Sequence, residues 1–186
     1  MSTKGTQTTA DYINFDTATK RGFDLINSDK QKLIGLYIIV SINLGLRVSD
    51  VLKLTWEQLI DKDELTIIEQ KTGKRRHLAI NDNIKKALAK FDNSNKGLIF
   101  VSQKGTAYKI QTINVILKEV FIKEKKLSIS THSCRKTFGR QVWNNNNQSD
   151  TALIYLSELF NHSNIAVTRK YLGINKEDLT NIYLSL

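Results

Sequence analysis

A chain of 186 residues with 40% hydrophobic content has the length and composition of one globular domain with a sizeable core. Its 28 Lys and Arg residues against 18 Asp and Glu give a formal net charge of +10, which favours a polyanionic partner such as nucleic acid. No apolar run approaches the ~20 residues of a membrane span, no apolar secretory segment follows Met1, and the single Cys134 excludes an internal disulfide and fits a reducing cytoplasm.

The first part of the chain is predicted to be helical. Residues 1–12 are polar and expected to be mobile, and a first helix is expected over 13–27. Apolar residues recur at helical spacing over 29–44, and Gly45 is a plausible stop for this second helix. A short helix is expected over 49–54.

A β-hairpin is predicted next. Strands over 65–70 and 76–80 flank Lys71-Thr72-Gly73-Lys74, where glycine suits a turn that needs positive φ. Asn81 or Asp82 can cap a helix that reaches Lys90.

The rest of the chain is again predicted to be helical, after a short apolar run over 98–101 of undecided type. Helices are expected over 107–125, 132–143, 150–159, 164–171 and 176–185. No proline, repeat or clear linker interrupts them. The elements together predict a mainly α domain with a small antiparallel β-sheet, an α+β fold.

Two basic segments upstream are candidates for phosphate binding. In Gly45-Leu46-Arg47-Val48-Ser49-Asp50, the arginine is either a surface residue paired with Asp50 or a fork over a phosphate, with Asp50 orienting it or its neighbours. In the hairpin turn, Lys71 can reach a substrate cleft or simply discourage aggregation at an edge strand. The turn is strongly basic, and its other candidates for phosphate contact are Lys74, Arg75 and Arg76.

A histidine and an arginine share one helical face in Ser130-Thr131-His132-Ser133-Cys134-Arg135. His132 and Arg135 are three residues apart, and Ser130 or Thr131 can cap the helix so that its positive end faces an anion. The alternative is an exposed arginine beside a hydrogen-bonded histidine. Cys134 diverges from His132 on a helix and is predicted to be a small buried residue rather than a nucleophile.

A second histidine is followed by a tyrosine. A helix opening after His162 places Tyr171 about two turns away, where Arg169 and Lys170 favour a nearby phosphate. The alternative is a packing tyrosine. Two tyrosines in apolar helical patterns are predicted to be core residues, Tyr37 and Tyr155.

Metal and nucleotide cofactors are not expected. The three histidines and one cysteine include no pair at zinc-ligand spacing. Gly73-Lys74 lacks the upstream glycine and the following Ser or Thr of a phosphate-binding loop.

In this order, the motifs resemble the catalytic domain of the tyrosine recombinase (phage integrase) family over roughly residues 30–175. Four motifs carry the resemblance: Leu44-Gly45-Leu46-Arg47-Val48-Ser49-Asp50, then Gln70-Lys71-Thr72-Gly73-Lys74, then Thr131-His132-Ser133-Cys134-Arg135-Lys136-Thr137-Phe138, and last Leu159-Phe160-Asn161-His162-Ser163 together with Thr168-Arg169-Lys170-Tyr171. Four motifs in the family's order with compatible spacing are far more specific than any one of them.

The resemblance implies cleavage and rejoining of double-stranded DNA without metal or ATP. Tyr171 would attack the scissile phosphate, leaving a 3′-phosphotyrosine and a free 5′-hydroxyl, and strand exchange would pass through a Holliday junction. The other implied roles are Arg47 and Arg135 as clamps of the non-bridging oxygens, Lys71 as general acid, His132 in proton transfer and His162 as a hydrogen-bond donor to the phosphate. A type IB topoisomerase-like nicking and resealing activity would use the same residues, and a catalytically silent DNA-binding domain is a further alternative.

The resemblance also implies an assembly and a place in the cell. Residues 1–29 are too short for the family's N-terminal core-binding domain, so we expect 30–174 to be a catalytic-domain fragment that binds DNA weakly. Residues 175–186 are expected to form a helix that packs on its own core or docks on a neighbouring subunit. We expect a homotetramer on DNA, with a monomer as the alternative for the free chain, in the bacterial cytoplasm at the nucleoid. Two departures from the family are Asn161, where glycine is usual, and Cys134, where leucine is usual.

Overall fold

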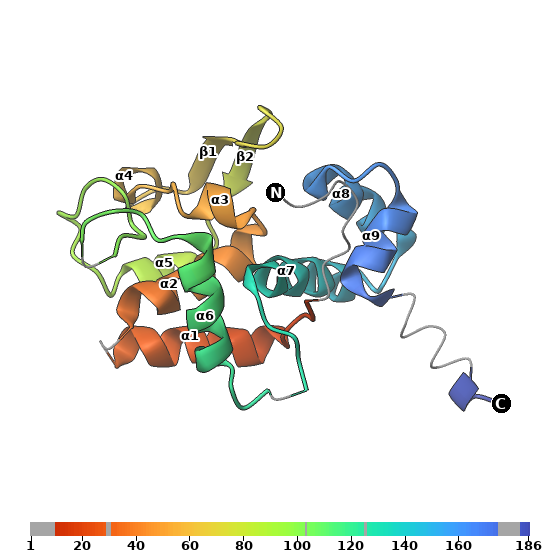
Figure 1. The fold of residues 1–186 in the computed structure, drawn as a ribbon. Helices are drawn as coiled ribbons and strands as arrows, with labels where there is room; N and C mark the ends of the chain where they lie inside the picture. Colours follow the sequence, from red (N-terminus) through yellow and green to blue (C-terminus); the bar gives the residue numbers. More distant parts are fainter. Residues whose placement is uncertain (1–9, 29–30, 103, 125, 175–182) are drawn as a thin grey trace.

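The chain folds as a mostly helical domain with one two-stranded antiparallel sheet (Figure 1). The computed structural model describes residues 10–28, 31–102, 104–124, 126–174 and 183–186. Its elements are α1 (Phe15–Asn27), α2 (Lys32–Leu44), α3 (Val48–Val51), α4 (Trp56–Leu59), β1 (Glu64–Ile68), β2 (Arg75–Ala79), α5 (Asp82–Leu88), α6 (Ile110–Val120), α7 (Thr131–Asn145), α8 (Asp150–Phe160) and α9 (Ile165–Leu172). The predicted fold class is confirmed.

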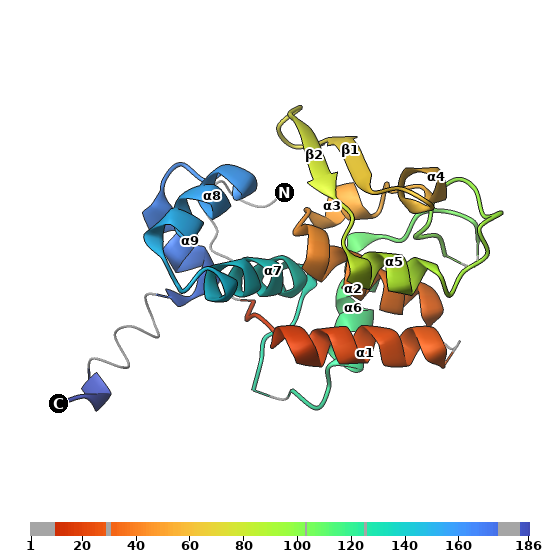
Figure 2. The same cartoon turned by 180° about the vertical axis from the view of Figure 1, so that it is seen from behind.

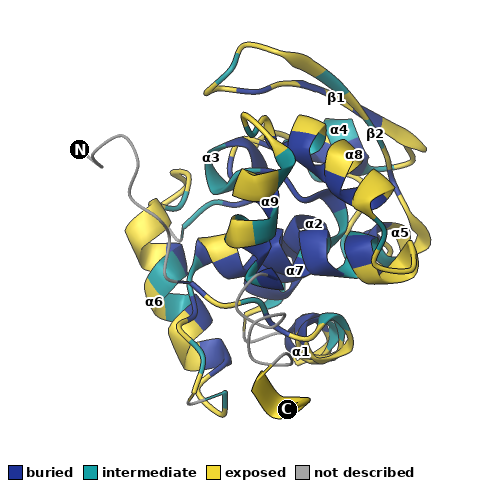
Figure 3. Ribbon diagram, turned by 90° about the vertical axis from the view of Figure 1, so that its right-hand side faces the viewer, coloured by how far each residue is buried: buried dark blue, intermediate teal, exposed yellow. Residues whose placement is uncertain are grey.

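Helix α2 lies at the centre of the larger part of the molecule and is buried along most of its length (Figure 3). It is apolar on every face, as expected of a helix that neighbours surround on all sides. Helix α1 approaches it closely, since a Cβ atom on Gly35 would lie 2.5 Å from the carbonyl oxygen of Gly22. The helix ends, as predicted, at Gly45, whose φ of 59° is left-handed.

The hairpin projects from this body, with β1 and β2 in antiparallel register from Glu64 opposite Ala79 to Ile68 opposite Arg75 (Figure 1). Strand β1 buries alternate residues, as a strand with one face on a core does. Both strands begin one residue earlier than predicted, and β1 also ends two residues earlier, so Glu69 and Gln70 belong to the connection. Gly73, with φ of 66°, takes the positive φ that the turn requires.

A second, smaller core forms around the C-terminal half of α7. Apolar side chains of α7, α8 and α9 pack there, and they include Trp143, Leu153, Leu156, Phe160 and Leu172. Helix α7 passes from the larger core into this one (Figures 1 and 2), and the end of α8 meets the hairpin through Lys74 and Arg76. Contacts between the two parts therefore decide how residues of the N-terminal and C-terminal motifs meet.

Several predicted elements differ in length or burial. Helix α6 is shorter than the expected 107–125, and at its start Ala107 instead forms an isolated bridge with Val101. Tyr155 is 63% exposed on α8, so its prediction as a core residue is wrong, whereas Tyr37 is buried. Helix α4, a single turn capped by Thr55 and Gln58, was not predicted. The predicted helix 176–185 falls mostly outside the described residues. No helix in the described part of the chain is long and apolar enough to cross a bilayer.

Candidate active site

Arg135 lies in the first turns of α7, whose start is set by a capping box between Ser130 and Ser133. Its guanidinium is buried, donating through Nη1 to the Gly45 carbonyl at 2.5 Å and through Nη2 to the Phe160 carbonyl at 3.4 Å. Burial lowers the pKa of Arg135 to about 10, which still leaves it charged at neutral pH.

Arg47 reaches the same carbonyl from the segment between α2 and α3. It precedes α3 in extended backbone, and its Nη2 donates to the Phe160 carbonyl oxygen at 3.1 Å. Arg47 and Arg135 therefore share one acceptor, a carbonyl at the C-terminal end of α8. Such carbonyls carry the partial negative charge of the helix end. The two arginines predicted to act together are brought together.

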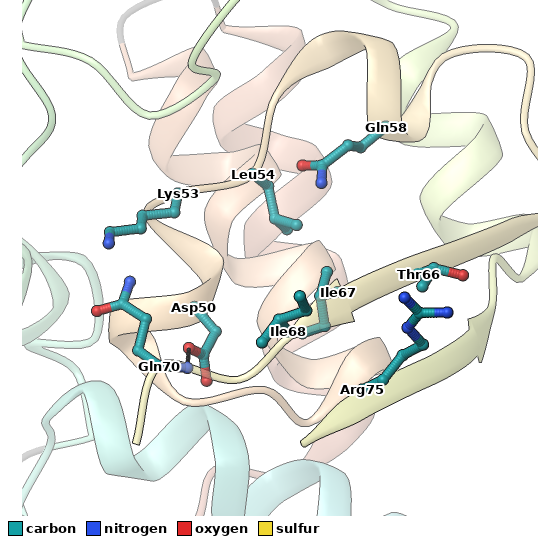
Figure 4. A pocket seen from close by; sticks show the side chains of 9 residues that line it. All are labelled: Asp50, Lys53, Leu54, Gln58, Thr66, Ile67, Ile68, Gln70 and Arg75. Atoms are coloured by element: carbon teal, nitrogen blue, oxygen red, sulfur yellow. Dashed lines mark hydrogen bonds between the residues drawn. The ribbon is translucent and has the colours of Figure 1, made fainter. Parts of the chain in front are cut away.

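The carboxylate that pairs with Arg47 is Glu69, and the alternative of a pair with Asp50 is wrong. Glu69 lies 2.8 Å from Arg47 Nη1 and 2.8 Å from Arg76 Nη1. Asp50 instead accepts a hydrogen bond from the backbone N–H of Gln70 at 3.0 Å, the dashed line in Figure 4. Its second carboxylate oxygen is buried with no hydrogen-bond partner in the described part of the chain. Asp50 thus holds the connection that follows β1 and is not the partner of the guanidinium.

Glu69 is absent from the residues predicted above, although its position carried a signal. Leu65 and Ile67 are the buried residues of β1, and Glu69 continues the same alternation. A carboxylate on the buried face of a strand is seldom left unpaired. Burial acts to raise the pKa of Glu69, but hydrogen bonds from Arg76, Thr72 and Arg47 outweigh it and hold the pKa at about 2.

The hairpin residues predicted to contact phosphate have different surroundings. Lys71 is exposed in the turn, and its charge contributes to the lowered pKa values of both His132 and His162. Lys74 donates to Asn161 Oδ1 at 2.8 Å. Arg75 is exposed and lines a pocket beside Thr66, behind the hairpin (Figure 4).

Arg76 makes its hydrogen bonds to other residues of the protein. Besides Glu69, its guanidinium donates to the Leu159 carbonyl at 3.2 Å, and its side chain is 13% exposed. Both contacts use Nη1, so this nitrogen is directed into the protein, and contact between Arg76 and DNA phosphate stays a prediction. On α9, Arg169 lies 3.5 Å from Asp150, and Lys170 is exposed.

The two predicted histidines differ in environment. His162 is half-buried, with Nδ1 2.9 Å from Thr168 Oγ1, and burial together with the charges of Arg135, Arg47 and Lys71 lowers its pKa to about 4. His132 is exposed at the start of α7, and partial desolvation with the charges of Lys136 and Arg135 lowers its pKa. Both rings are therefore neutral at pH 7 and can accept or relay a proton.

The Tyr171 hydroxyl is buried and makes no hydrogen bond to any described residue. Its ring centroid lies 5.2 Å from that of His162 and 5.5 Å from that of Phe160, with Lys136 Nζ 5.1 Å from the ring. Burial raises the pKa of Tyr171 to about 12, while the charges of Arg135 and Arg47 oppose the rise. The phenol is thus a weak nucleophile in this conformation, although the charges of both arginines act on it.

The arrangement supplies one anion site, two neutral imidazoles, an exposed lysine and a phenol. Among the residues that the structure describes, no group of three or more His, Cys, Asp and Glu residues could hold a metal ion. Cys134, predicted to be buried, is 1% exposed, and burial raises the pKa of its thiol to about 12, which leaves it inert.

Known proteins resemble this chain in sequence and fold. Residues 25–178 match the phage integrase family. A Bacillus subtilis protein named probable integrase/recombinase YoeC is 31% identical over 157 residues, which are 82% of this chain and 83% of that protein. Tyrosine recombinase XerC of the same organism is 28% identical over 153 residues, 76% of this chain and 49% of its own length.

A solved structure of XerA recombinase has the same fold, with a TM-score of 0.68 at 20% identity, covering 98% of this chain and 66% of that one. The chain thus spans about half the length of the XerC relatives that it matches, and most of the shorter relative. Since the family match extends over far more than half of the chain, the protein belongs to the phage integrase family, the tyrosine recombinases.

Proposed function

We propose that this chain is the catalytic domain of a site-specific DNA recombinase that cleaves and rejoins DNA through a 3′-phosphotyrosine bond. The observation that carries the proposal is the convergence of Arg47 and Arg135 on a single oxygen, the Phe160 carbonyl, beside the Tyr171 phenol. A pair of guanidinium groups aimed at one oxygen is the arrangement that binds a phosphate.

In the proposed reaction, the scissile phosphate takes the place of the Phe160 carbonyl between the two arginines. A phosphate oxygen carries more negative charge than a carbonyl oxygen and binds guanidinium more strongly, so DNA can displace the internal acceptor. The displacement must move the end of α8, and with it the segment that carries His162 and Tyr171. The arginines then stabilise the charge that grows on the non-bridging oxygens during attack.

Protons have to leave Tyr171 and reach the departing oxygen. The Tyr171 oxygen forms a bond to phosphorus while the bond from phosphorus to the 5′-oxygen breaks, and the phenol proton passes to a base. Neutral His132 is the proposed acceptor, since its pKa is lowered rather than raised. Lys71, exposed on its turn, protonates the 5′-oxygen. Neutral His162, held by Thr168, donates to the phosphate through its other ring nitrogen.

DNA is the proposed partner because of charge and of known complexes with the same fold. The formal net charge is +10, which attracts a polyanion. Solved structures that share the fold include XerH recombinase bound to its difH substrate and a lambda integrase dimer bound to a core site. The proposed contacts with the DNA backbone are made by Lys74, Arg75, Arg76, Arg169 and Lys170.

We also propose a homotetramer on DNA in which residues 175–186 of one subunit dock on the next. Two observations support an intersubunit surface. Helices α8 and α9 expose large apolar side chains, with Tyr155 63%, Ile154 45% and Val167 40% exposed. The chain end also exposes Tyr183, Leu184 and Leu186. Sedimentation of the chain with and without cognate DNA tests this, and a monomer on saturated DNA would contradict it.

The reaction is tested with a pool of nicked duplexes of randomised sequence, so that the same experiment identifies the target. Protein-linked DNA is recovered under denaturing conditions and sequenced to define the site. We expect a 3′-linked adduct with the parent chain and none with Tyr171→Phe. An adduct that survives this substitution would refute the assignment, and plasmid relaxation without exchange between two duplexes would favour a topoisomerase-like activity instead.

A further inference from the structure

Glu69 is a buried carboxylate at the edge of the proposed active site, with its side chain only 2% exposed. A carboxylate is kept charged at such a position only where hydrogen bonds and opposite charges replace the lost water. Its two oxygens accept three hydrogen bonds, from Arg47 at 2.8 Å, Thr72 at 2.7 Å and Arg76 at 2.8 Å. Both carboxylate oxygens of Glu69 therefore have hydrogen-bond donors, and we call Glu69 with its three donors the Glu69 junction.

The three donors belong to different segments of the chain. Arg47 lies just before α3, Thr72 follows Lys71 in the hairpin turn, and Arg76 is in β2. The backbone of Glu69 also closes the turn, accepting from Gly73 N at 2.8 Å and donating to the Lys74 carbonyl at 3.0 Å. One residue thus ties the turn that presents Lys71 to the segment that presents Arg47.

Charge explains why the junction needs an acid. Two guanidinium groups share Glu69, so the trio carries one net positive charge. Arg47 and Arg76 can then lie close together and still direct their remaining donors at the end of α8, to the Phe160 and Leu159 carbonyls. Without the carboxylate, the two like charges would repel each other, and Arg47 would lose the contact that fixes its fork.

We propose that Glu69 is a positioning residue that sets the oxyanion clamp of Arg47 and the general acid Lys71 relative to one another. The inference rests on the proposed function, because it concerns the same reaction. A misplacement of about 1 Å in such a constellation can slow a reaction about 10²-fold. Glu69 would therefore affect the rate without touching the DNA.

The test separates the two groups that Glu69 positions. Thr72→Val removes the hydrogen bond between Glu69 and the Lys71 turn, together with a longer one within the turn from Lys74 N at 3.3 Å. Glu69→Gln instead removes the charge that holds Arg47. Thr66→Val is the matched control, since Thr66 lies on the same hairpin and its hydroxyl contacts His77 Nδ1 at 2.9 Å, away from Glu69. Thermal unfolding of each full-length variant verifies that it folds.

Cleavage is measured on two versions of the recovered DNA site, one ordinary and one with sulfur in place of the bridging 5′-oxygen. A thiolate leaves without a proton, because thiols have a pKa of about 8.5, so the sulfur version bypasses Lys71. We expect Thr72→Val to cleave ordinary DNA about 10-fold more slowly than the parent, a loss at the low end of those caused by removing a positioning contact. On the sulfur version its cleavage rate should be near that of the parent. Glu69→Gln should be about 10²-fold slow on ordinary DNA and only partly restored by sulfur. Thr66→Val should match the parent on both.

Three outcomes would overturn the inference. The first is parent-like cleavage of ordinary DNA by Thr72→Val and Glu69→Gln. The second is an equal loss on both substrates for Thr72→Val, which general structural damage would produce. The third is a cleavage rate of Glu69→Gln that equals the parent rate on the sulfur version. That result would mean that Glu69 does not position Arg47. If Glu69→Gln fails to fold, Thr72→Val decides alone. A parent chain that forms no adduct on either substrate would instead refute the proposed function.

Discussion

Acidification from pH 7 to pH 5 should destabilise the protein through His162. The pKa of this ring falls from its ordinary value of 6.5 to about 4 in the folded chain, because burial and the charges of Arg135, Arg47 and Lys71 disfavour the imidazolium. Between these two values, the unfolded chain binds a proton that the folded chain does not. The free energy of unfolding therefore decreases as the pH falls below 6.5. Above pH 6.5 the ring is mostly neutral in both states, and little stability is lost through it.

The size of the effect follows from the two pKa values. If the ring were wholly shielded from water, the loss between pH 7 and pH 5 would be about 2 kcal/mol. His162 is half-buried, so solvent screening reduces the expected loss to about 1 kcal/mol. The hydrogen bond from Nδ1 to Thr168 holds the ring in this environment.

Urea unfolding of the parent and of His162→Gln at both pH values measures the contribution. Glutamine stays polar but does not titrate, so the stability difference between the two proteins should change by about 1 kcal/mol between pH 7 and pH 5. Glu69, which also titrates differently in the folded state, is common to both proteins and cancels in the difference. Parallel loss of stability in the two proteins would refute the reasoning, as would an imidazole NMR titration of His162 centred near 6.5.

Gly45→Ala should lower the free energy of unfolding by about 2–4 kcal/mol in urea titrations, since φ is 59° and the new Cβ would lie 2.2 Å from the Phe138 ring; a change below about 0.5 kcal/mol would contradict this packing. Arg135→Lys should slow adduct formation about 10²–10³-fold, because a single ammonium replaces the guanidinium that reaches both the Gly45 and the Phe160 carbonyls. A rate like that of the parent would show that Arg135 does not belong to the active site. Asn161 has φ of 55° and binds Lys74, so Asn161→Gly should stay within about 0.5 kcal/mol of the parent while Asn161→Ala loses about 1 kcal/mol; equal stability of the two variants would show that backbone strain is unimportant there.

Much of the fold could be predicted from local patterns. Helical periodicity predicted α2 and its end at Gly45, and the cap at Ser130 with the three-residue spacing placed His132 and Arg135 at the start of α7. Such signals depend on neighbours within one or two turns, which the sequence displays directly. The prediction failed for Tyr155 because α8 turns that side of its apolar pattern away from the second core, a choice made by packing and not by periodicity.

The candidate site divides in the same way. The order of the motifs predicted that Arg47, Arg135 and Tyr171 lie together in one site. The one pairing considered for Arg47, as an alternative to a phosphate contact, was with its sequence neighbour Asp50, whereas its partner is Glu69, 22 residues away. The pairing across that distance requires the hairpin to fold back onto α3.

The sequence by itself thus determined the helical domain with its hairpin and the resemblance to a recombinase family, and it supplied the candidate site residues apart from Glu69. Only the tertiary structure decided how these residues meet. The Phe160 carbonyl, 113 residues from Arg47 in the chain, accepts hydrogen bonds from both arginines at the proposed phosphate position, and the Tyr171 hydroxyl is buried without a partner among the described residues. Periodicity and capping act over a few residues, but the charge state and donors of a site depend on groups that packing brings together from both cores.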